Sequence, residues 1–260
     1  MKTYTKETLI AAIQEIKHKG WIKNQRPNND GGIGNTLEDL LGIQENNLPI
    51  PNAAEWELKT QRADTSSLTT LFRMEPSPTA FRFVPQILLP NYGWPHQKAG
   101  VSYPANEVSF RQTINALNPS DRGFKVVVDK ADRKIIISFS SLAISARHSA
   151  WKNKVESMMG LDELSPQPYW GFDDLFYKLG TKLHNCFYVK AARKKENGVE
   201  YYHYNELLML KSLSRTNFIS AIEAGNIYVD FDARTGHNHG TKFRVKQSII
   251  PSLYEDVTIL

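Results

Sequence analysis

Residues 54–60 alternate apolar and charged side chains. In an extended chain, Trp56 and Leu58 point to one side, while the charged residues between them, Glu57 and Lys59 among them, point to the other. This period of two predicts a half-buried strand with one apolar face and one charged face. The chain must therefore build a sheet that is covered on at least one side.

Helical and strand patterns are interspersed along the rest of the chain, which predicts a mixed α/β fold. Thr5 is a candidate cap for the first helix, and Gly20 a candidate stop. We expect helices at residues 5–19, 35–41, 172–183, 207–213 and 217–224. Further strands are expected at 68–72, 81–89, 185–191, 201–204, 227–231 and 241–245, with a β-hairpin formed by 124–129 and 134–139 and irregular structure over 90–122.

Composition narrows the functional classes. The chain has 260 residues, and its 32 basic against 27 acidic side chains give a net charge of +5, which permits binding to a polyanion without proving it. The single cysteine, Cys186, excludes an intrachain disulfide and a multi-cysteine zinc site, and its apolar neighbours predict a packing role. The N-terminus has no apolar signal core and no apolar run is long enough for a membrane span, so we expect a cytoplasmic protein.

The charged strand carries a pattern suited to phosphodiester hydrolysis. Such chemistry needs oxygen ligands for a divalent metal and a cation beside the attacking water. Glu57 and Lys59 share a strand face, and the carbonyl of Leu58 can add a backbone ligand. The pattern alone is weak evidence, because Glu15-Ile16-Lys17 repeats it in the first helix as a solvated face. An exposed strand face is the alternative interpretation of Glu57 and Lys59.

Several segments resemble the MvaI/BcnI family of restriction endonucleases in order and spacing: 34–41, 44–47, 55–60, 68–72, 169–175, 201–205 and 237–244. The resemblance implies a PD-(D/E)XK nuclease fold, with a core sheet flanked by helices and two lobes around a cleft for double-stranded DNA. It also implies Mg²⁺. We expect a single nuclease domain over residues 1–260, with the catalytic core mainly in 1–90 and the recognition elements mainly in 90–260.

By position, the resemblance makes Glu57 a metal ligand, Lys59 the catalytic lysine and Glu38 a further acid of the site. The alternative for Glu38 is a charge favoured by the N-terminal end of a helix dipole. The upstream acid of the motif should fall five residues before Glu57, where this chain has Asn52. An amide oxygen can coordinate Mg²⁺ but brings no negative charge.

Three explanations of Asn52 are open. The enzyme can use Asn52 as a ligand and recruit Glu55 or Glu38 for the missing charge, which we favour because Glu55 is on the charged strand face. Alternatively, Asn52 is an inactivating change, or the protein is a degenerate nuclease that only binds DNA.

The resemblance places DNA reading in the C-terminal part of the chain. Arginine and histidine can donate to guanine, and aspartate can accept from cytosine. The candidates are Arg73, Asp230, Asp232, Arg234, His237, His239, Lys242 and Arg244. The two histidines could instead bind a metal or sit in a plain polar loop, and Arg73 could be an ordinary surface residue.

The sequence therefore favours a Mg²⁺-dependent type II restriction endonuclease, which by resemblance acts as a monomer on duplex DNA. A cognate DNA methyltransferase is expected in the same system. The alternatives are a DNA-binding protein of the same fold without catalysis and a MutH-like DNA nickase.

Overall fold

The computed structural model describes residues 4–27, 29, 31–43, 56–63 and 66–260. The expected mixed α/β class is confirmed, because helices alternate with strands that form several sheets. The chain divides into two compact units. Unit 1 comprises residues 1–67, 176–217 and 247–260, and unit 2 comprises residues 68–175 and 218–246.

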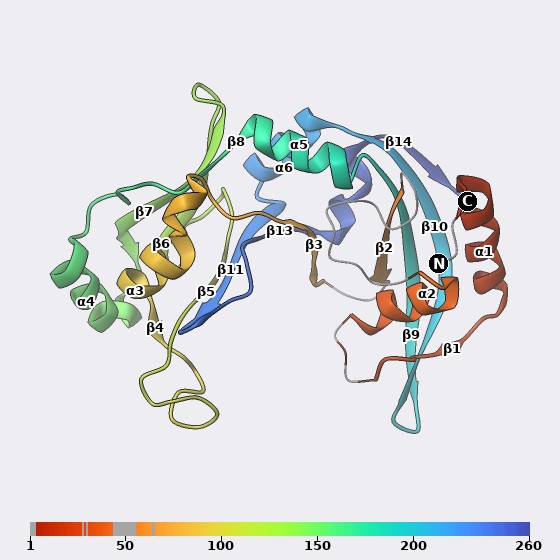
Figure 1. Cartoon of the computed structure of the whole chain (residues 1–260), viewed down its shortest axis with the longest axis horizontal. Coiled ribbons are helices and arrows are strands. Elements are labelled where there is room, and N and C mark those ends of the chain that lie inside the picture. The colour runs from red at the N-terminus through yellow and green to blue at the C-terminus, as the bar shows by residue number, and fades with distance from the viewer. Residues whose placement is uncertain (1–3, 28, 30, 44–55, 64–65) are drawn as a thin grey trace. The chain divides into compact units, whose positions relative to one another are not determined.

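Unit 1 is built on one sheet with the strand order β1-β10-β9-β2, in which β14 also pairs with β10 (Figure 1). Its strands are β1 (Ile22–Lys23), β2 (Trp56–Arg62), β9 (Asn185–Glu196), β10 (Val199–Leu213) and β14 (Tyr254–Ile259). Strand β2 runs parallel to β9, and β9 and β10 form a long antiparallel hairpin. Because β2 ends the order, one of its edges is unpaired among the described strands.

Helices α1 (Lys6–His18) and α2 (Gly32–Leu41) pack with this sheet in one apolar core. Thr5 caps α1 as expected, since its Oγ1 accepts a hydrogen bond from the Thr8 amide at 3.2 Å. Gly42 ends α2 with a φ of +68°, a conformation that favours glycine. The apolar residues of both helices meet Trp56 and Leu58, so the helices cover the apolar face of β2.

Unit 2 contains two sheets. The larger has the order β3-β13-β11-β5-β4, with β12 paired to β11, and the smaller has the order β6-β7-β8. Their strands are β3 (Leu68–Arg73), β4 (Trp94–Pro95), β5 (Val108–Ile114), β6 (Arg122–Asp129), β7 (Lys134–Ile144), β8 (Tyr169–Gly171), β11 (Ile227–Arg234), β12 (His237–Asn238) and β13 (Lys242–Lys246). The expected hairpin of β6 and β7 is confirmed.

The remaining helices are α3 (Leu89–Tyr92), α4 (Ser149–Met159), α5 (Phe172–Lys182) and α6 (Arg215–Glu223). Short 3-10 turns occur at Thr79–Phe81, Ala146–His148, Gln247–Ile249 and Pro251–Leu253, and a π-helical turn at Val84–Leu88. Within the described parts of the chain, no helix is long and apolar enough to span a bilayer.

Three expectations about secondary structure were wrong. Residues 81–89 are helical rather than extended, because Pro85 and Pro90 lack the amide donors of a ladder strand but fit the first turn of a helix. Residues 207–213 belong to β10 rather than to a helix, since they pair with both β9 and β14. Residues 108–114, placed in an irregular region, form β5.

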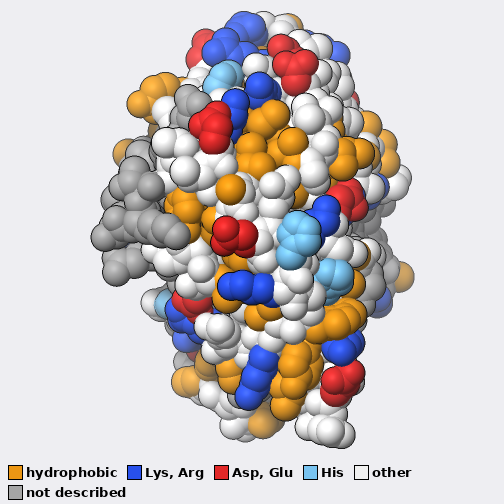
Figure 2. All heavy atoms as spheres, turned by 90° about the vertical axis from the view of Figure 1, so that its right-hand side faces the viewer, with side chains coloured by type: hydrophobic (Ala, Val, Ile, Leu, Met, Phe, Trp, Pro, Cys, Tyr) orange, Lys and Arg blue, Asp and Glu red, His pale blue; other side chains and the backbone are white. Residues whose placement is uncertain are grey.

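The net positive charge of the chain does not make every part of its surface positive. Figure 2 shows a face on which the described basic, acidic, histidine and hydrophobic side chains are interspersed. A binding site for a polyanion is therefore indicated by local clusters of residues, not by the net charge.

Candidate functional sites: a buried carboxylate–lysine pair and an ion-paired sheet

Glu57 and Lys59 form a close ion pair on β2. The Lys59 Nζ donates to Glu57 Oε1 at 2.6 Å. The Glu57 side chain is only 2% exposed and the Lys59 side chain 20% exposed. These low exposures exclude the alternative interpretation, in which Glu57 and Lys59 lie on an exposed strand face.

The second oxygen of Glu57 has an incomplete environment. Glu57 Oε2 is buried and has no hydrogen-bond partner in the part of the chain that the structure describes. A buried carboxylate oxygen without a partner is costly, because it loses hydration and gains nothing in return. Such an oxygen beside a lysine fits the donor set of a divalent cation, for which carboxylate oxygen is a preferred ligand.

The backbone of Leu58 is oriented away from the rest of the sheet. The amide of Ala63, directly after β2, donates to the carbonyl of Ala191 at 2.9 Å. Successive strand residues turn their amide and carbonyl groups to alternate edges, so residues at odd positions of β2 bond to β9. The carbonyl of Leu58 therefore points to the edge of β2 that no described strand pairs with, an orientation compatible with its expected role as a backbone ligand.

The neighbour of Glu57 on β9 is Cys186. Its thiol is buried, as expected for a packing residue, and burial raises the pKa of Cys186 to about 12. The thiol therefore stays protonated near neutral pH, and it does not compete with Glu57 as an anion for the charge of Lys59.

Glu38 is half-buried on α2. One turn earlier, a Cβ at Gly34 would lie 3.0 Å from Thr60 Oγ1, so this side of α2 faces β2. Residues four apart share a helix side, which places Glu38 on the side that faces β2. Its role as a further acid stays a prediction. Asn52 and Glu55 lie outside the described residues.

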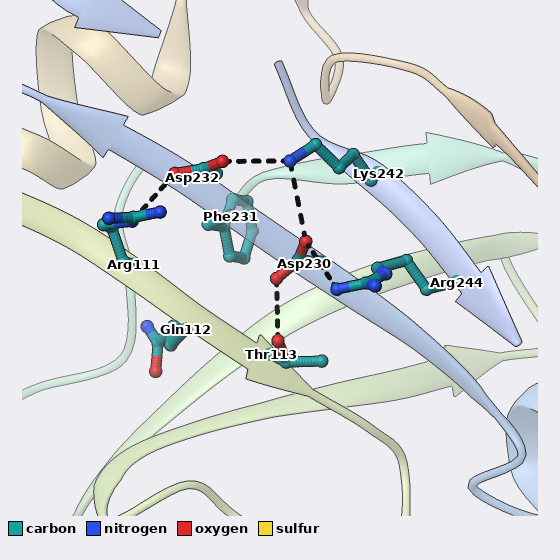
Figure 3. Close-up of a pocket in the computed structure, with 8 residues that line it drawn as sticks. All are labelled: Arg111, Gln112, Thr113, Asp230, Phe231, Asp232, Lys242 and Arg244. Carbon is teal, nitrogen blue, oxygen red and sulfur yellow. Dashed lines mark hydrogen bonds and ion pairs between the residues drawn. The ribbon is translucent and has the colours of Figure 1, made fainter. Parts of the chain in front are cut away.

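A second charged cluster lies on the larger sheet of unit 2. Strand pairing places Asp230 between Thr113 and Lys242, and Asp232 beside Arg111. These residues line a pocket of about 360 Å³ together with Gln112, Phe231 and Arg244. Figure 3 shows the side chains of Asp230 and Asp232 on β11 between polar and charged side chains of β5 and β13.

Ion pairs connect the cluster into a chain. Asp232 binds Arg111 Nε at 2.8 Å and Lys242 Nζ at 3.0 Å. Asp230 lies 3.9 Å from Lys242 Nζ and 3.4 Å from Arg244 Nη1, and it accepts from Thr113 Oγ1 at 2.7 Å. The acids and bases thus hold each other in fixed positions, as the dashed lines in Figure 3 indicate.

The environment of Asp232 keeps it ionised. Burial raises the pKa of its carboxyl, but the hydrogen bond from Lys242 and the charges of Lys242 and Arg111 outweigh this effect. The net pKa of Asp232 lies below its ordinary value. Asp232 therefore acts as a permanent acceptor at neutral pH.

The other candidates are not among the residues that line this pocket. Arg73 ends β3 opposite Lys242 and is exposed. Arg234 instead pairs with Glu107 at 3.1 Å and stacks on Tyr103. Sequence reasoning missed Arg111 and Thr113, because they lie in a segment that carried no clear strand signal.

His237 and His239 form an aromatic pair with ring centroids 4.2 Å apart. Burial lowers the pKa of His239, so its ring is neutral near neutral pH. Among the residues that the structure covers, no group of three or more His, Cys, Asp or Glu side chains could hold a metal ion. The alternative of a histidine metal site thus gains no support from described donors.

The fold is that of solved restriction endonuclease structures. A complex of restriction endonuclease MvaI with cognate DNA is 25% identical, with a TM-score of 0.77 and coverage of 99% of each chain. The same endonuclease without DNA is 26% identical, with a TM-score of 0.54 and coverage of 100% of this chain and 99% of that one. Curated proteins gave no significant match.

The model of the MvaI/BcnI restriction endonuclease family matches residues 10–254, nearly the whole chain. The protein therefore belongs to this family, which confirms the resemblance found in its sequence. The buried pair on β2 and the ion-paired cluster on β11 lie within the matched range.

Proposed function

We propose that the protein is a type II restriction endonuclease that hydrolyses phosphodiester bonds of double-stranded DNA at a specific sequence with Mg²⁺. Membership of the family supports the class of reaction. The observation that carries the catalytic assignment is the buried Oε2 of Glu57, which has no hydrogen-bond partner among the described residues and lies beside the amine of Lys59.

Glu57 and the carbonyl of Leu58 would hold the metal, with Asn52, Glu55 or Glu38 completing the ligand set. Bound Mg²⁺ supplies neutralisation of the scissile phosphate and a lower pKa for a bound water. Lys59 has three donors and uses one on Glu57, so it can also hold the attacking oxygen in position. The burial of Glu57 keeps bulk water away and strengthens these interactions.

The cluster on β5, β11 and β13 is the proposed base-reading surface. Its arginines can donate to guanine, and its aspartates can accept from the amino group of cytosine. The internal ion pairs orient these groups before DNA arrives, which lowers the entropic cost of binding. Arg73, His237 and His239 would contact the DNA around this surface.

Asn52 favours one second candidate, a DNA-binding protein of the same fold with impaired catalysis, because it leaves the metal site one negative charge short. A MutH-like nickase is a third possibility, separable by whether one or both strands are cut. For the endonuclease, we propose monomeric action within a cleft, and a methyltransferase that protects the host DNA at the same sequence.

A cleavage assay on unmethylated phage DNA tests the proposal. It compares Mg²⁺ with EDTA for the parent chain, Lys59→Ala, Asn52→Asp and Lys17→Ala. Lys17 is the matched control, because it belongs to the other Glu-X-Lys, on α1.

We expect discrete Mg²⁺-dependent fragments from the parent and Lys17→Ala, and none from Lys59→Ala. Cleavage only by Asn52→Asp would identify Asn52 as an inactivating residue. Retained DNA binding without cleavage by any variant would refute the enzyme and support the binding protein.

A further inference from the structure

One face of the unit 1 sheet continues from the proposed catalytic pair into a cluster of cations and aromatic rings. Residues paired across neighbouring strands share a face. Strand pairing sets Glu57 beside Cys186, Lys59 beside Tyr188 and Gln61 beside Lys190. Further along β9, residues alternate, so Lys190 and Lys194 lie on this same face.

The far end of this face is defined by five residues, which we call the hairpin patch: Trp21, Lys23, Lys194, Tyr201 and His203. Tyr201 is paired with Lys194 on one side and with Lys23 on the other. The Lys194 Nζ lies 4.6 Å from the ring centroid of Trp21 and 5.7 Å from that of Tyr201. Trp21 also packs against His203, with ring centroids 5.6 Å apart.

The patch is accessible and positively charged. Trp21 is 42% exposed although it is large and apolar, and Lys23 is exposed as well. Lys194 also pairs with Glu196 at 2.9 Å, but the Glu196 side chain is 58% exposed. An ion pair between two solvent-accessible side chains is weak, so a phosphate can displace the carboxylate.

A polar residue links the patch to the catalytic pair. Gln61 follows Lys59 by two positions on the same face, and its side chain is about nine-tenths buried. Its Oε1 has no hydrogen-bond partner among the described residues. The face therefore presents, in order, the Lys59 amine, an amide whose acceptor is unused among the described residues, the ion pair of Lys190 with Glu206 at 2.6 Å, and the patch.

We propose that the hairpin patch binds the phosphate backbone of the duplex beyond the recognition sequence. The lysines would supply positive charge, and the rings of Trp21 and Tyr201 would hold the Lys194 amine in place. The inference rests on the proposed nuclease function, because its position is defined relative to the catalytic pair.

Strand geometry gives the spacing. Lys194 lies six residues beyond Tyr188, the partner of Lys59, which is about 20 Å along the strand at ~3.3 Å per residue. One DNA strand advances about 3.4 Å per nucleotide. The patch would thus meet phosphates about six base pairs from the cleaved bond, outside a short recognition site.

The test uses two duplexes that contain the recognition sequence found by fragment mapping. One extends twelve base pairs beyond the cleavage positions on each side and the other three. Binding is measured in a Lys59→Ala background, and cleavage at saturating duplex in the parent background. The test variant is Lys23→Gln with Lys194→Gln. The matched control is Lys6→Gln with Lys17→Gln, which removes the same charge on α1, the helix that packs on the opposite face of the sheet.

For the long duplex, we expect the Lys23/Lys194 variant to bind about tenfold more weakly near 0.1 M salt, with a salt slope smaller by about two. The parent, the test variant and the control variant should bind the short duplex with equal affinity. The rate of cleavage at saturating duplex should be the same in all three. Equal affinity for the long duplex, or an equal loss with both duplexes, would overturn the proposal. Cleavage by the parent establishes the nuclease function separately from either result.

Discussion

Glu57 sits in an environment that a purely structural residue would rarely occupy. One oxygen is satisfied by Lys59, while the other is buried without a described partner. Leaving a buried polar group unpaired costs on the order of 1–3 kcal/mol, so folding alone gives no reason to keep it. A bound cation would remove this cost, and metal binding should therefore appear as added stability.

We predict that Mg²⁺ stabilises the parent chain against thermal unfolding and does not stabilise Glu57→Gln. At a concentration ten times the dissociation constant, the gain is about 1.4 kcal/mol. Glu15→Gln, from the solvated Glu-X-Lys of α1, should respond to Mg²⁺ like the parent. An equal Mg²⁺ response of Glu57→Gln and the parent would remove Glu57 from the metal site.

His239 gives a second prediction, which concerns pH. Burial lowers its pKa, so the free protein carries a neutral ring at pH 7. A nearby phosphate would stabilise the charged ring, so binding takes up a proton and DNA affinity falls as the pH rises. Titrations with DNA between pH 5.5 and 8 should show this trend in the parent and in the exposed α1 variant His18→Gln, and a weaker trend in His239→Gln. An unchanged trend in His239→Gln would place the residue away from the DNA.

At the scale of elements, strong local signals predicted structure well. Thr5 and the apolar spacing after it predicted α1, and two β-branched runs around a polar turn predicted the hairpin of β6 and β7. The prediction of a helix at residues 207–213 was wrong. Leucine and methionine favour a helix locally, but pairing with two neighbouring strands makes this segment a strand. The pairing of Arg111 with Asp232 could not be predicted from local sequence patterns, because the two residues lie on strands that are distant in sequence.

The contact between α2 and β2 gives a prediction about stability. A side chain at Gly34 would press on Thr60, because even a Cβ would lie 3.0 Å from its hydroxyl oxygen. We expect Gly34→Leu to lower the free energy of unfolding by about 1–3 kcal/mol through overpacking. Gly180 on α5 has open space around it, so Gly180→Leu should stabilise the protein by about 0.5–1 kcal/mol through helix propensity. Urea unfolding distinguishes the two, and equal effects would show that α2 does not pack closely on β2.

At the scale of the whole molecule, charge pairs are distributed over both units. Asp39 in unit 1 is paired with Arg26, and Asp121 in unit 2 with His148 and Arg147. The sequence could give the number of charges but not this arrangement, because each pair joins residues that only the fold brings together. The resemblance to the family, rather than the spacing alone, identified Glu57 and Lys59 as candidate catalytic residues, and the structure shows that their side chains are in contact.

These pairs lead to a prediction about acid stability. Besides the exposed Glu7, whose pKa is lowered mainly by a backbone hydrogen bond, four carboxyls among the described residues have a pKa below the ordinary value: Asp39, Asp121, Glu200 and Asp232. The hydrogen bond from Arg26 is the main cause for Asp39; for the other three, partner groups outweigh the opposing effect of burial.

A carboxyl with a lowered folded-state pKa contributes stability that is fully present above its unfolded pKa, about 4, and is lost as the pH falls through the folded value. His239 acts in the same direction, because its neutral folded form resists protonation below about pH 6.5. We therefore expect the free energy of unfolding to decline slightly from pH 7 to 5 and steeply below pH 4.

Since each unit holds two of the four carboxyls, probes in both units should report the loss over the same pH range. Urea unfolding between pH 3 and 7 measures it, with Asp121→Asn and Asp39→Asn each expected to flatten the acid limb; a stability that stays constant down to pH 3 would contradict the assignment of these ion pairs.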